Sequence, residues 1–298
     1  MESSLRKPSG LTSTDAAIGL IIALLWGFNY IAIKISVLHF PPIFATGLRF
    51  ACVAAILIWF TKPPKGMFGQ IIGISAVFGT AHFAFLFIGM TEVDLSVSAI
   101  ILQLGTPFSA IFSWIILKDS FGWKRAFGMV IAFAGIMIIV GEPSVSSNLF
   151  YIALCFISAI CWGVTNIQIK MLDRIGPFQL NAWMSLFAVP QLFILSVFLE
   201  EGQWAAIESA GITEWTSIIY MAVGASIGAY GLWYYLMNKY EVSRIVGINL
   251  LPPVVAALAS AWLFGEVMSW EKIVGGLITL LGVAVIQIRW NRITGPVE

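Results

Sequence analysis

The sequence predicts an all-α integral membrane protein in which ten transmembrane helices form two inverted five-helix repeats. Three observations lead to this fold class. The 298 residues are 59% hydrophobic and only 10% charged, with a mean hydropathy of +0.94. Ten apolar stretches are each long enough to cross a bilayer as a helix. The same residue pattern also occurs in both halves of the chain.

Composition excludes several other classes of protein. A soluble domain carries roughly a quarter charged residues, so this chain lacks the polar surface that water requires. The formal net charge of +1 argues against a nucleic-acid partner. The three cysteines, Cys52, Cys155 and Cys161, lie in apolar stretches without the spacing of a disulfide framework or a zinc site. We therefore expect no metal and no cofactor, and the polar segment 1–14 does not resemble a secretory signal.

Turn-forming residues divide the first half into five spans. Pro41 and Pro42 separate the first span from the second, and the segment 62–66, with two prolines, separates the second from the third. Glu92 and Asp94 lie between the third and fourth spans, and a glycine and proline in the segment 141–144 end the fifth. The predicted spans are 15–37, 42–60, 69–90, 95–117 and 124–140.

The second half divides in the same way. Gly176 and Pro177 separate the sixth span from the seventh, and Gly202 follows the seventh. Lys239 follows the eighth span, and Glu266 precedes the tenth. The predicted spans are 149–171, 178–199, 215–237, 243–264 and 271–289.

The basic residues indicate the orientation of these spans. With the N-terminus in the cytoplasm, 13 of the 16 lysines and arginines lie in cytoplasmic segments, and the exceptions are Lys34, Arg49 and Lys272. Cytoplasmic loops of membrane proteins are enriched in lysine and arginine. We therefore predict a multi-pass protein of the cell inner membrane with both tails, 1–14 and 291–298, in the cytoplasm.

The internal repeat has a geometric consequence. Both halves contain a Trp-Gly pair, an asparagine and a lysine: Trp26, Gly27, Asn29 and Lys34, and Trp162, Gly163, Asn166 and Lys170. Near the end of each half, an offset of 147 residues relates Asp119, Trp123, Gly128 and Gly135 to Glu266, Trp270, Gly275 and Gly282. The predicted units are residues 15–141 and 149–290. Because each unit has an odd number of spans, the second must be inverted in the membrane, which suits a transporter working by alternating access.

These features resemble the EamA family of the drug/metabolite transporter superfamily. The matching motifs, in order, are the Trp-Gly-x-Asn of the first span, Gly47-Leu48-Arg49-Phe50, Phe83-Ala84-Phe85-Leu86-Phe87, Gly231-Leu232-Trp233, Lys239-Tyr240-Glu241, Leu250-Leu251-Pro252-Pro253-Val254-Val255 and Gly265-Glu266. The resemblance implies a central cavity lined by spans other than the fifth and tenth. It also implies export of amino acids or related small metabolites, such as O-acetylserine and cysteine, from the cytoplasm.

Two titratable side chains lie deep in predicted spans. A charge near the bilayer midplane is costly and must face the bundle interior, so Arg49 is predicted either to bind a substrate carboxylate or to lock helix packing. His82 lies in the middle of the third span. If transport is coupled to protons, His82 is the one mid-membrane side chain of the usual titratable kind that could carry the proton. The alternative, which we favour, is a neutral histidine that is hydrogen-bonded inside the bundle.

Further polar and aromatic residues are candidates for the cavity wall. Asn29 and Asn166 are related by the repeat and accompany Trp26 and Trp162, deeper than an interfacial aromatic belt, so we favour cavity positions for them. They could equally be hydrogen bonds between helices. Weaker candidates with the same two interpretations are Gln103, Trp183, Tyr230, Tyr234 and Asn249.

Three prolines interrupt predicted helices. Pro107 lies in the fourth span, and Pro252 and Pro253 lie in the ninth. Proline bends a helix and frees a carbonyl, and broken helices in transporters often line the site or form a hinge. We predict a hinge or kink at these positions rather than direct substrate contact.

Two other functions are compatible with parts of the sequence. Within transporters, the abundance of tryptophan and phenylalanine is also compatible with hydrophobic drug-like cargo. From another class, Gly224, Ser226 and Gly228 match the Gly-x-Ser-x-Gly motif of serine hydrolases, but in an apolar helix rather than a strand–turn–helix. We predict a transporter and not an enzyme, with a small-molecule substrate and the lipid bilayer as partners. The glycines of the tenth span, Gly275, Gly276 and Gly282, either pack against a second subunit in a homodimer or pack against a neighbouring helix.

Overall fold

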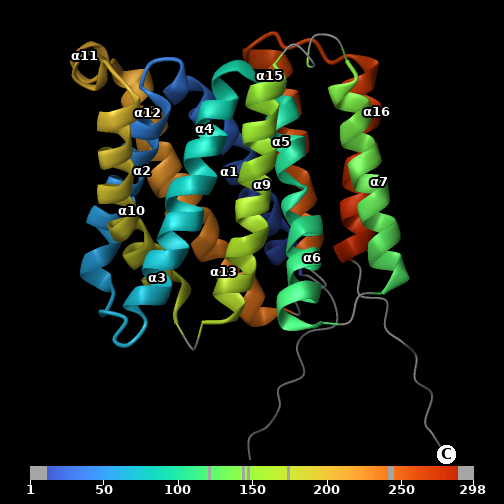
Figure 1. Cartoon of the computed structure of the whole chain (residues 1–298), viewed down its shortest axis with the longest axis horizontal. Coiled ribbons are helices and arrows are strands. Elements are labelled where there is room, and N and C mark those ends of the chain that lie inside the picture. The colour runs from blue at the N-terminus through green and yellow to red at the C-terminus, as the bar shows by residue number, and fades with distance from the viewer. Residues whose placement is uncertain are drawn as a thin grey trace, which may run out of the picture.

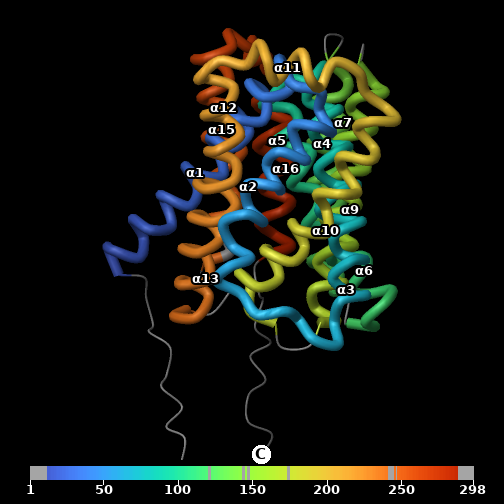
Figure 2. Tube along the Cα trace, turned by 90° about the vertical axis from the view of Figure 1, so that its left-hand side faces the viewer, coloured from blue at the N-terminus to red at the C-terminus, as the bar shows by residue number. Residues whose placement is uncertain are grey.

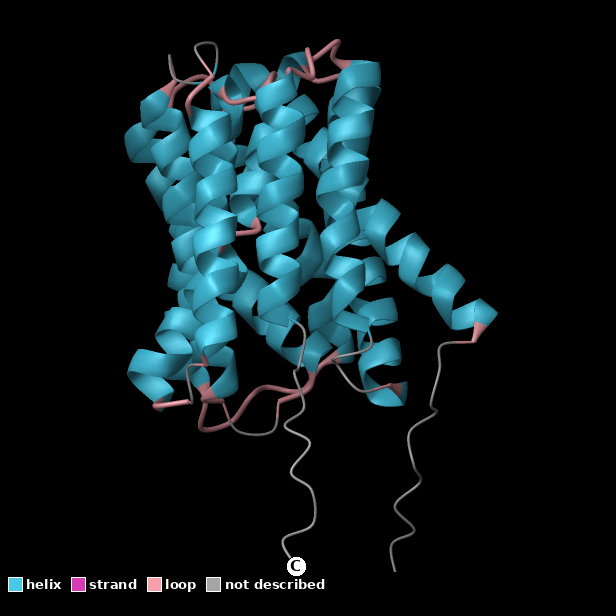
Figure 3. Ribbon diagram, turned by 90° about the vertical axis from the view of Figure 1, so that its right-hand side faces the viewer, coloured by secondary structure: helices cyan, strands magenta, loops and turns pink. Residues whose placement is uncertain are grey.

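The computed structural model describes residues 12–119, 122–142, 145, 148–172, 175–240 and 245–287, and all regular elements among them are helices (Figure 1 and Figure 3). The elements are α1 (Ser13–Val37), α2 (Pro42–Leu57), η1 (Ile58–Phe60), α3 (Phe68–Ile74), η2 (Ser75–His82), α4 (Phe83–Glu92), α5 (Leu95–Leu102), α6 (Gly105–Leu117), α7 (Trp123–Val140), α9 (Leu149–Lys170), α10 (Pro177–Leu199), α11 (Gln203–Ser209), α12 (Ile212–Ile219), η3 (Tyr220–Ala229), α13 (Tyr230–Lys239), η4 (Val246–Leu250), α15 (Leu251–Leu263) and α16 (Trp270–Gln287).

In the described part of the chain, nine helical segments are long and apolar enough to cross a membrane. They agree closely with nine predicted spans: Ser13–Val37, Pro42–Phe60, Phe68–Glu92, Leu95–Leu117, Trp123–Val140, Leu149–Lys170, Pro177–Leu199, Ile212–Lys239 and Trp270–Gln287. The ninth predicted span, 243–264, coincides with the shorter apolar helix Gly247–Leu263. The all-helical membrane fold is confirmed, whereas the exact count of ten spans stays a prediction.

The structure describes only some of the residues from which the orientation in the membrane is predicted. Most of the two tails lies outside the described residues, as do six of the basic residues that support the orientation: Arg6, Lys7, Arg174, Arg244, Arg289 and Arg292. We call the end of the bundle at which α1 begins and α16 ends the terminal face, and the end at which α1 ends and α16 begins the opposite face; the terminal face is at the bottom of Figure 1.

The outer surface of the bundle is apolar. Phe198 is 81% exposed and Trp262 is 82% exposed, although both are large hydrophobic residues in long helices. A soluble protein rarely presents such side chains over a continuous surface, whereas lipid accepts them. The small and polar side chains instead gather inside the bundle, among them fully buried Ser36, Ser96 and Ser185.

The helices pair according to the repeat. α1 packs against α15 and against η3, and α9 packs correspondingly against α6 and η2. α2 packs against α10, and α7 packs against α16. Each of these contacts joins one half of the chain to the other. If the two halves are exchanged, the contacts of α1 with α15 and η3 become those of α9 with α6 and η2. This is the arrangement expected of two related units in opposite orientations.

Two spans contain a π-helical turn at equivalent positions. In the third span, η2 leads into α4 at Phe83, and in the eighth, η3 leads into α13 at Tyr230. The two starting residues are separated by the same 147 positions that relate Asp119 to Glu266 in the sequence. π-Helical turns widen a helix locally and are frequent at functional sites. The repeat therefore extends to an unusual feature of the backbone.

The predicted proline interruptions lie just after breaks in the helices. The fourth span divides into α5 and α6, and Pro107 is the third residue of α6. The 3₁₀ helix η4 precedes α15, in which Pro252 and Pro253 are the second and third residues. The first turn of a helix tolerates proline because its amides need no intrahelical acceptor. The prolines thus mark where each helix restarts, and their role as hinges stays a prediction.

Glycines allow α7 and α16 to approach closely. A Cβ atom added to Gly135 would lie 2.5 Å from the Gly275 carbonyl oxygen, and one added to Gly282 would lie 2.5 Å from the Gly128 carbonyl oxygen. The two helices therefore cross in antiparallel directions with their backbones in contact. Because Gly275 and Gly282 pack against a helix of the same chain, they do not require a second subunit, and a homodimer stays a prediction.

We expect Gly135→Ala and Gly282→Ala to lower the thermal stability of the protein. The atoms that a Cβ would meet belong partly to backbone, which cannot turn aside, and overpacking typically costs about 1–3 kcal/mol. Gly69→Ala is the matched control, because a Cβ there meets no atom within 4 Å. Melting curves of the purified variants in detergent measure the effect. Equal melting temperatures for Gly135→Ala and Gly69→Ala would contradict the proposed contact.

Candidate functional site

A cavity of about 650 Å³ lies between the two halves. This volume is within the range of small-molecule sites. α7 contributes none of its lining residues and α16 contributes Gln287, so the expectation that the tenth span takes no part was wrong for that residue. Ten of the eleven predicted binding residues line the cavity: Trp26, Asn29, Arg49, His82, Gln103, Trp162, Asn166, Tyr230, Tyr234 and Asn249.

Trp183 is the predicted residue that the structure does not bring to this cavity. Its ring packs 5.6 Å from Phe68 and 6.2 Å from Phe187, measured between ring centres. It also lies beside the buried cluster formed by Val53, Leu57, Ala182 and Ala222. Trp183 therefore belongs to the packing between α2, α3 and α10. Of the three prolines predicted as hinges or kinks, Pro252 lines the cavity.

Arg49 places a cation in the wall of the cavity, halfway along α2. The residue is 3% exposed. Its Nε and Nη2 atoms donate hydrogen bonds to Ser226 Oγ at 3.2 and 2.9 Å. The guanidinium carbon lies 4.4 Å from the centre of the Phe83 ring, where a cation–π attraction compensates part of the lost hydration. Among the described residues, nothing accepts a hydrogen bond from Nη1.

His82 makes a reciprocal contact with α9. Its Nδ1 atom lies 2.8 Å from the Ser158 carbonyl oxygen, and the Ser158 hydroxyl donates to the His82 carbonyl oxygen at 2.9 Å. The imidazole stacks on Phe78 with 5.0 Å between ring centres. These contacts suit the neutral, hydrogen-bonded histidine that the sequence favours. A role in proton transfer stays a prediction.

The amide side chains are partly used between helices and partly left for the cavity. Gln103 Nε2 donates to the Asn249 carbonyl oxygen at 2.9 Å, and Asn166 Nδ2 donates to Ser109 Oγ at 2.8 Å. In the described structure, the Oδ1 atoms of Asn29 and Asn249 are buried without a hydrogen-bond donor. A buried acceptor without a partner is costly, so both atoms favour a ligand that can donate to them.

Aromatic rings form two groups on the cavity wall. Trp26 contacts Tyr230 and Trp233, with ring centres 5.4 and 5.7 Å apart. On the other side, Trp162 lies 5.3 Å from Phe78. The first group joins α1 to α13, and the second joins η2 to α9, so each group includes the tryptophan of one Trp-Gly pair. The wall therefore combines flat apolar surfaces with one cation and a few amides.

The cavity extends to the terminal face. Ile169, Pro177, Met237 and Gln287 all lie near helix ends on that face and line the cavity. The first turns of α1 lean outward there, away from the other helices (Figure 2). In the second half, the lining residues of α9 begin only at Trp162, far from the start of this helix at the opposite face. The cavity is thus placed asymmetrically along the bundle.

At the opposite face, charged side chains of the second half hold helix ends of the first half. The Glu200 carboxylate accepts hydrogen bonds from two amides at the start of α2, at 2.7 and 3.0 Å. Glu266 does the same at the start of α5, at 2.7 and 3.3 Å. The buried Lys272 ammonium pairs with Asp94 at 2.6 Å. Carboxylates at helix N-termini satisfy amides that lack intrahelical partners and complement the helix dipole.

Different ion pairs occur at the terminal face. Lys239 contacts the buried carboxylate of Asp15 at 2.8 Å, and the Tyr240 hydroxyl donates to the same carboxylate at 2.5 Å. Lys170 pairs with Asp119 at 2.6 Å, and this hydrogen bond lowers the pKa of the Asp119 carboxyl. These pairs join neighbouring helices around the mouth of the cavity.

Comparison with known proteins decides the family. The EamA-like transporter family matches residues 15–141 and 149–288. The chain belongs to this family. It is 26% identical over 294 residues to a probable amino-acid metabolite efflux pump of Escherichia coli (strain K12), covering 95% of this chain and 98% of that protein. It is 27% identical over 286 residues to a protein of the same name from Salmonella typhimurium (strain LT2), covering 92% and 95%.

A solved structure shares the fold of this EamA-family transporter. The structure, titled "Crystal structure of protein", matches with a TM-score of 0.62 at 18% identity, over 92% of this chain and 96% of that one. At this identity the likeness concerns the fold alone. The family and the helical architecture together identify the chain as a multi-pass membrane transporter.

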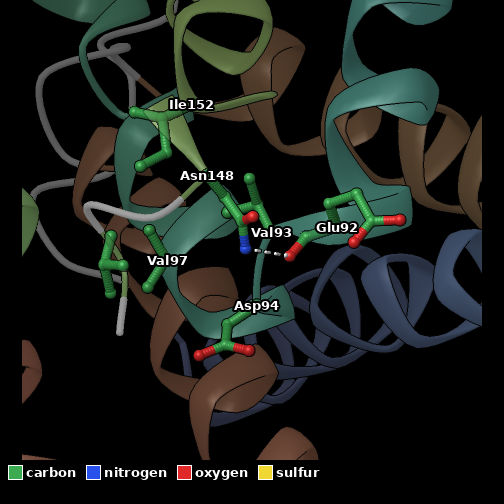
Figure 4. Close-up of a pocket in the computed structure, with 7 residues that line it drawn as sticks. Glu92, Val93, Asp94, Val97, Asn148 and Ile152 are labelled. Carbon is green, nitrogen blue, oxygen red and sulfur yellow. Dashed lines mark hydrogen bonds between the residues drawn. The ribbon is translucent and has the colours of Figure 1, made fainter. Parts of the chain in front are cut away.

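A second, much smaller pocket of the transporter lies at the opposite face. Figure 4 shows it between the end of α4 and the start of α9, where Asn148 Nδ2 donates to the Glu92 carbonyl oxygen at 3.1 Å. Its volume of about 20 Å³ suffices for roughly one water molecule. The described residues hold no group of three metal-ligating side chains there or elsewhere. This pocket is too small for a transported metabolite.

Several lining residues were missed by the sequence analysis although a helical pattern marks them. Starting at Trp26, Trp162 or Tyr230, lining residues recur after three, four and seven positions. Three of these, Asn29, Asn166 and Tyr234, were among the candidates, whereas the sequence analysis missed Tyr30, Ile33, Thr165, Ile169, Trp233 and Met237. This spacing selects one face of a helix. Extending each recognised tryptophan or tyrosine along its own face would have found them. Phe78 and Asn181 carry no comparable signal.

We expect Trp162→Leu to raise the apparent KM for transported cargo about three- to tenfold, because an aromatic contact in the cavity is lost. Trp183→Leu is the matched control outside the cavity, and its apparent KM is expected to stay within about twofold of wild type even if stability falls. Transport kinetics in proteoliposomes measure both variants. A larger KM change for Trp183→Leu than for Trp162→Leu would contradict the assignment of the cavity.

Proposed function

We propose that this EamA-family transporter exports amino acids or related small metabolites, of the O-acetylserine and cysteine kind, from the cytoplasm by alternating access. The observation that carries this proposal is the charge pattern of the cavity. Among its lining residues, Arg49 is the one formally charged side chain. A single guanidinium with a free donor fits a cargo that carries one carboxylate. Two relatives named probable amino-acid metabolite efflux pumps support the same class of cargo.

The other lining groups suit the rest of such a molecule. The unpartnered Oδ1 atoms of Asn29 and Asn249 are acceptors that an ammonium group could satisfy. The face of Trp26 or Tyr230 offers a cation–π contact to the same group. Gln103 and Asn166 supply further neutral hydrogen bonds. In this arrangement, the carboxylate and the ammonium of a zwitterion have separate partners.

The orientation of the chain in the membrane decides to which side the cavity opens. We place both tails in the cytoplasm and the transporter in the inner membrane, because 13 of the 16 basic residues then lie in cytoplasmic segments. The terminal face is then cytoplasmic, and a cavity that reaches it is accessible from the cytoplasm. This conformation is the one that loads cargo for export.

The contacts at the opposite face then act as the closed outer gate. Glu200, Glu266 and the Lys272–Asp94 pair all join the second half to the first. Opening toward the outside requires that these contacts break and that contacts across the terminal face form. An inverted repeat can exchange the two states because each half can adopt the conformation of the other.

A second candidate cargo is a hydrophobic, drug-like compound. The observation that favours it is the aromatic wall, which comprises Trp26, Tyr30, Phe78, Phe83, Trp162, Phe178, Tyr230, Trp233 and Tyr234. Such a cargo would leave the Arg49 donor unused at a desolvation cost, so we rank it second.

We do not propose an enzyme. In the described structure, the hydroxyl of Ser226 bonds to Arg49 and to the Met221 carbonyl, whereas His82 bonds to Ser158.

We expect Arg49→Ala to abolish saturable uptake of radiolabelled cysteine, O-acetylserine or threonine into proteoliposomes, because the carboxylate loses its charged partner. Arg49→Lys keeps the charge but lacks the fork, that is, the two parallel N–H donors of the guanidinium. It is expected to raise the apparent KM about tenfold, the scale of one charge-assisted hydrogen bond. Repeating the assay with an imposed pH gradient tests proton coupling. Full uptake by Arg49→Ala would refute the carboxylate site, and no uptake by folded wild type would favour the drug-like cargo.

We expect the charge reversal Asp94→Lys to open the outer gate, because it places two cations beside each other at the opposite face. The double variant Asp94→Lys with Lys272→Asp restores opposite charges and should restore most of the closure. Labelling of Ile33→Cys with a membrane-impermeant maleimide, in a background without native cysteines, reports access from outside. Equal labelling rates for the single and double variants would show that this pair does not control the gate.

A further inference from the structure

Ser226 occupies the point where Arg49 meets the second half of the transporter. It lies in the π-helical turn η3 and is 3% exposed. Its hydroxyl donates to the Met221 carbonyl oxygen, five residues earlier, at 2.8 Å. Because the one hydroxyl hydrogen is committed to that carbonyl, the oxygen faces Arg49 as an acceptor. The π-helical turn therefore fixes the direction of the Ser226 oxygen.

The contact uses one particular edge of the guanidinium. Arginine presents an Nε–Nη2 edge and an Nη1–Nη2 edge, and either edge can hold a carboxylate with two parallel hydrogen bonds. Ser226 Oγ accepts from Nε and Nη2. Nη1, on the second edge, has no acceptor among the described residues. Occupation of the first edge thus leaves the second edge for an anion in the cavity.

The inverted counterpart of this contact has no charge. Gln191 of α10 donates to Ser75 Oγ at 3.0 Å and accepts from Thr80 Oγ1 at 2.9 Å, and both partners lie in η2. Each π-helical turn is therefore bound by a side chain of the α2–α10 pair from the other half. Arg49 lines the cavity, whereas Gln191 is absent from its lining residues. Of two equivalent contacts, one carries the cation that faces the cargo.

We propose that Ser226 is a positioning residue that orients the Arg49 fork and so sets the preference of the transporter for carboxylated cargo. This inference rests on the proposed role of Arg49 in binding the carboxylate. Ser226 and Arg49 belong to different halves, so a movement between α2 and η3 alters the orientation of the fork. The affinity for a carboxylate then differs between the two conformations, which allows binding on one side and release on the other.

The test compares an amino acid with its amide, which lacks the carboxylate charge. In proteoliposomes, unlabelled acid and amide compete with the labelled form of whichever of cysteine, O-acetylserine or threonine gives uptake. Ser226→Ala is expected to reduce the preference for the acid on the order of tenfold, the scale of a hydrogen bond to a charged group, with the maximal rate within about twofold of wild type. Ser226→Thr keeps a hydroxyl and is expected to keep most of the preference.

Matched variants separate positioning from general packing. Thr80→Val removes a hydroxyl from the equivalent contact in the other half and should leave the preference unchanged. Ser226→Cys keeps the size of the side chain but is a weak acceptor, so it is expected to behave as Ser226→Ala does and replaces it if the alanine variant does not fold.

The outcomes distinguish this inference from the proposed function. If Arg49→Ala abolishes uptake while Ser226→Ala and Ser226→Cys keep the wild-type preference for the acid, the positioning role is overturned and the carboxylate site stands. If wild type has no preference, or Arg49→Ala retains it, then Arg49 does not bind the carboxylate and both proposals fail. Loss of preference in Thr80→Val as well as in Ser226→Ala would mean that any weakened contact between the halves has this effect, which also overturns the positioning role.

Discussion

The organisation of the cavity depends on one buried cation, the guanidinium of Arg49. An arginine at the centre of a membrane helix costs about 2.5–3.5 kcal/mol even on insertion scales, so the surrounding structure must compensate it. Within the described residues no carboxylate does so, and the compensation comes from the Ser226 hydroxyl and the Phe83 ring. Ser226 belongs to the other half of the chain. The compensation of the charge therefore depends on a contact between the two halves, and Nη1 has no acceptor among the described residues.

The irregular parts of the backbone lie where this cation and the cavity can use them. Lipid satisfies no amide or carbonyl group, so non-helical or widened backbone persists in a membrane only where it is buried in protein or lines a cavity. The π-helical turns η2 and η3 and the breaks before α6 and α15 are all adjacent to the cavity. The uninterrupted helices α7 and α16 instead pack through glycines at the side of the bundle. The cavity wall thus combines these irregular segments with the regular helices α1, α2 and α9, whereas α7 contributes no lining residue.

Duplication accounts for the positions of the elements but not for their chemistry. The two halves place π-helical turns, helix breaks and a Trp-Gly pair at equivalent sites. The polar contacts have diverged, since Arg49 binds one π-helical turn and neutral Gln191 binds the other. At the opposite face, Glu200 and Glu266 bind helix N-termini across the halves, whereas the mouth at the terminal face is bordered by pairs such as Lys239 with Asp15. The two faces therefore carry different polar contacts, and the cavity reaches the terminal face.

The sequence by itself determined the membrane location, nine of the spans and the relation between the halves, because apolar length and residue spacing are local properties of a chain in lipid. It also identified Arg49, the two Trp-Gly-Asn groups and most polar residues of the cavity, because a polar side chain deep in a span must face inward. Only the tertiary structure decided that Trp183 packs away from the cavity and that Ser226 binds Arg49. The partner of a buried side chain depends on how helices distant in sequence rotate and cross, and the composition of one helix does not specify this.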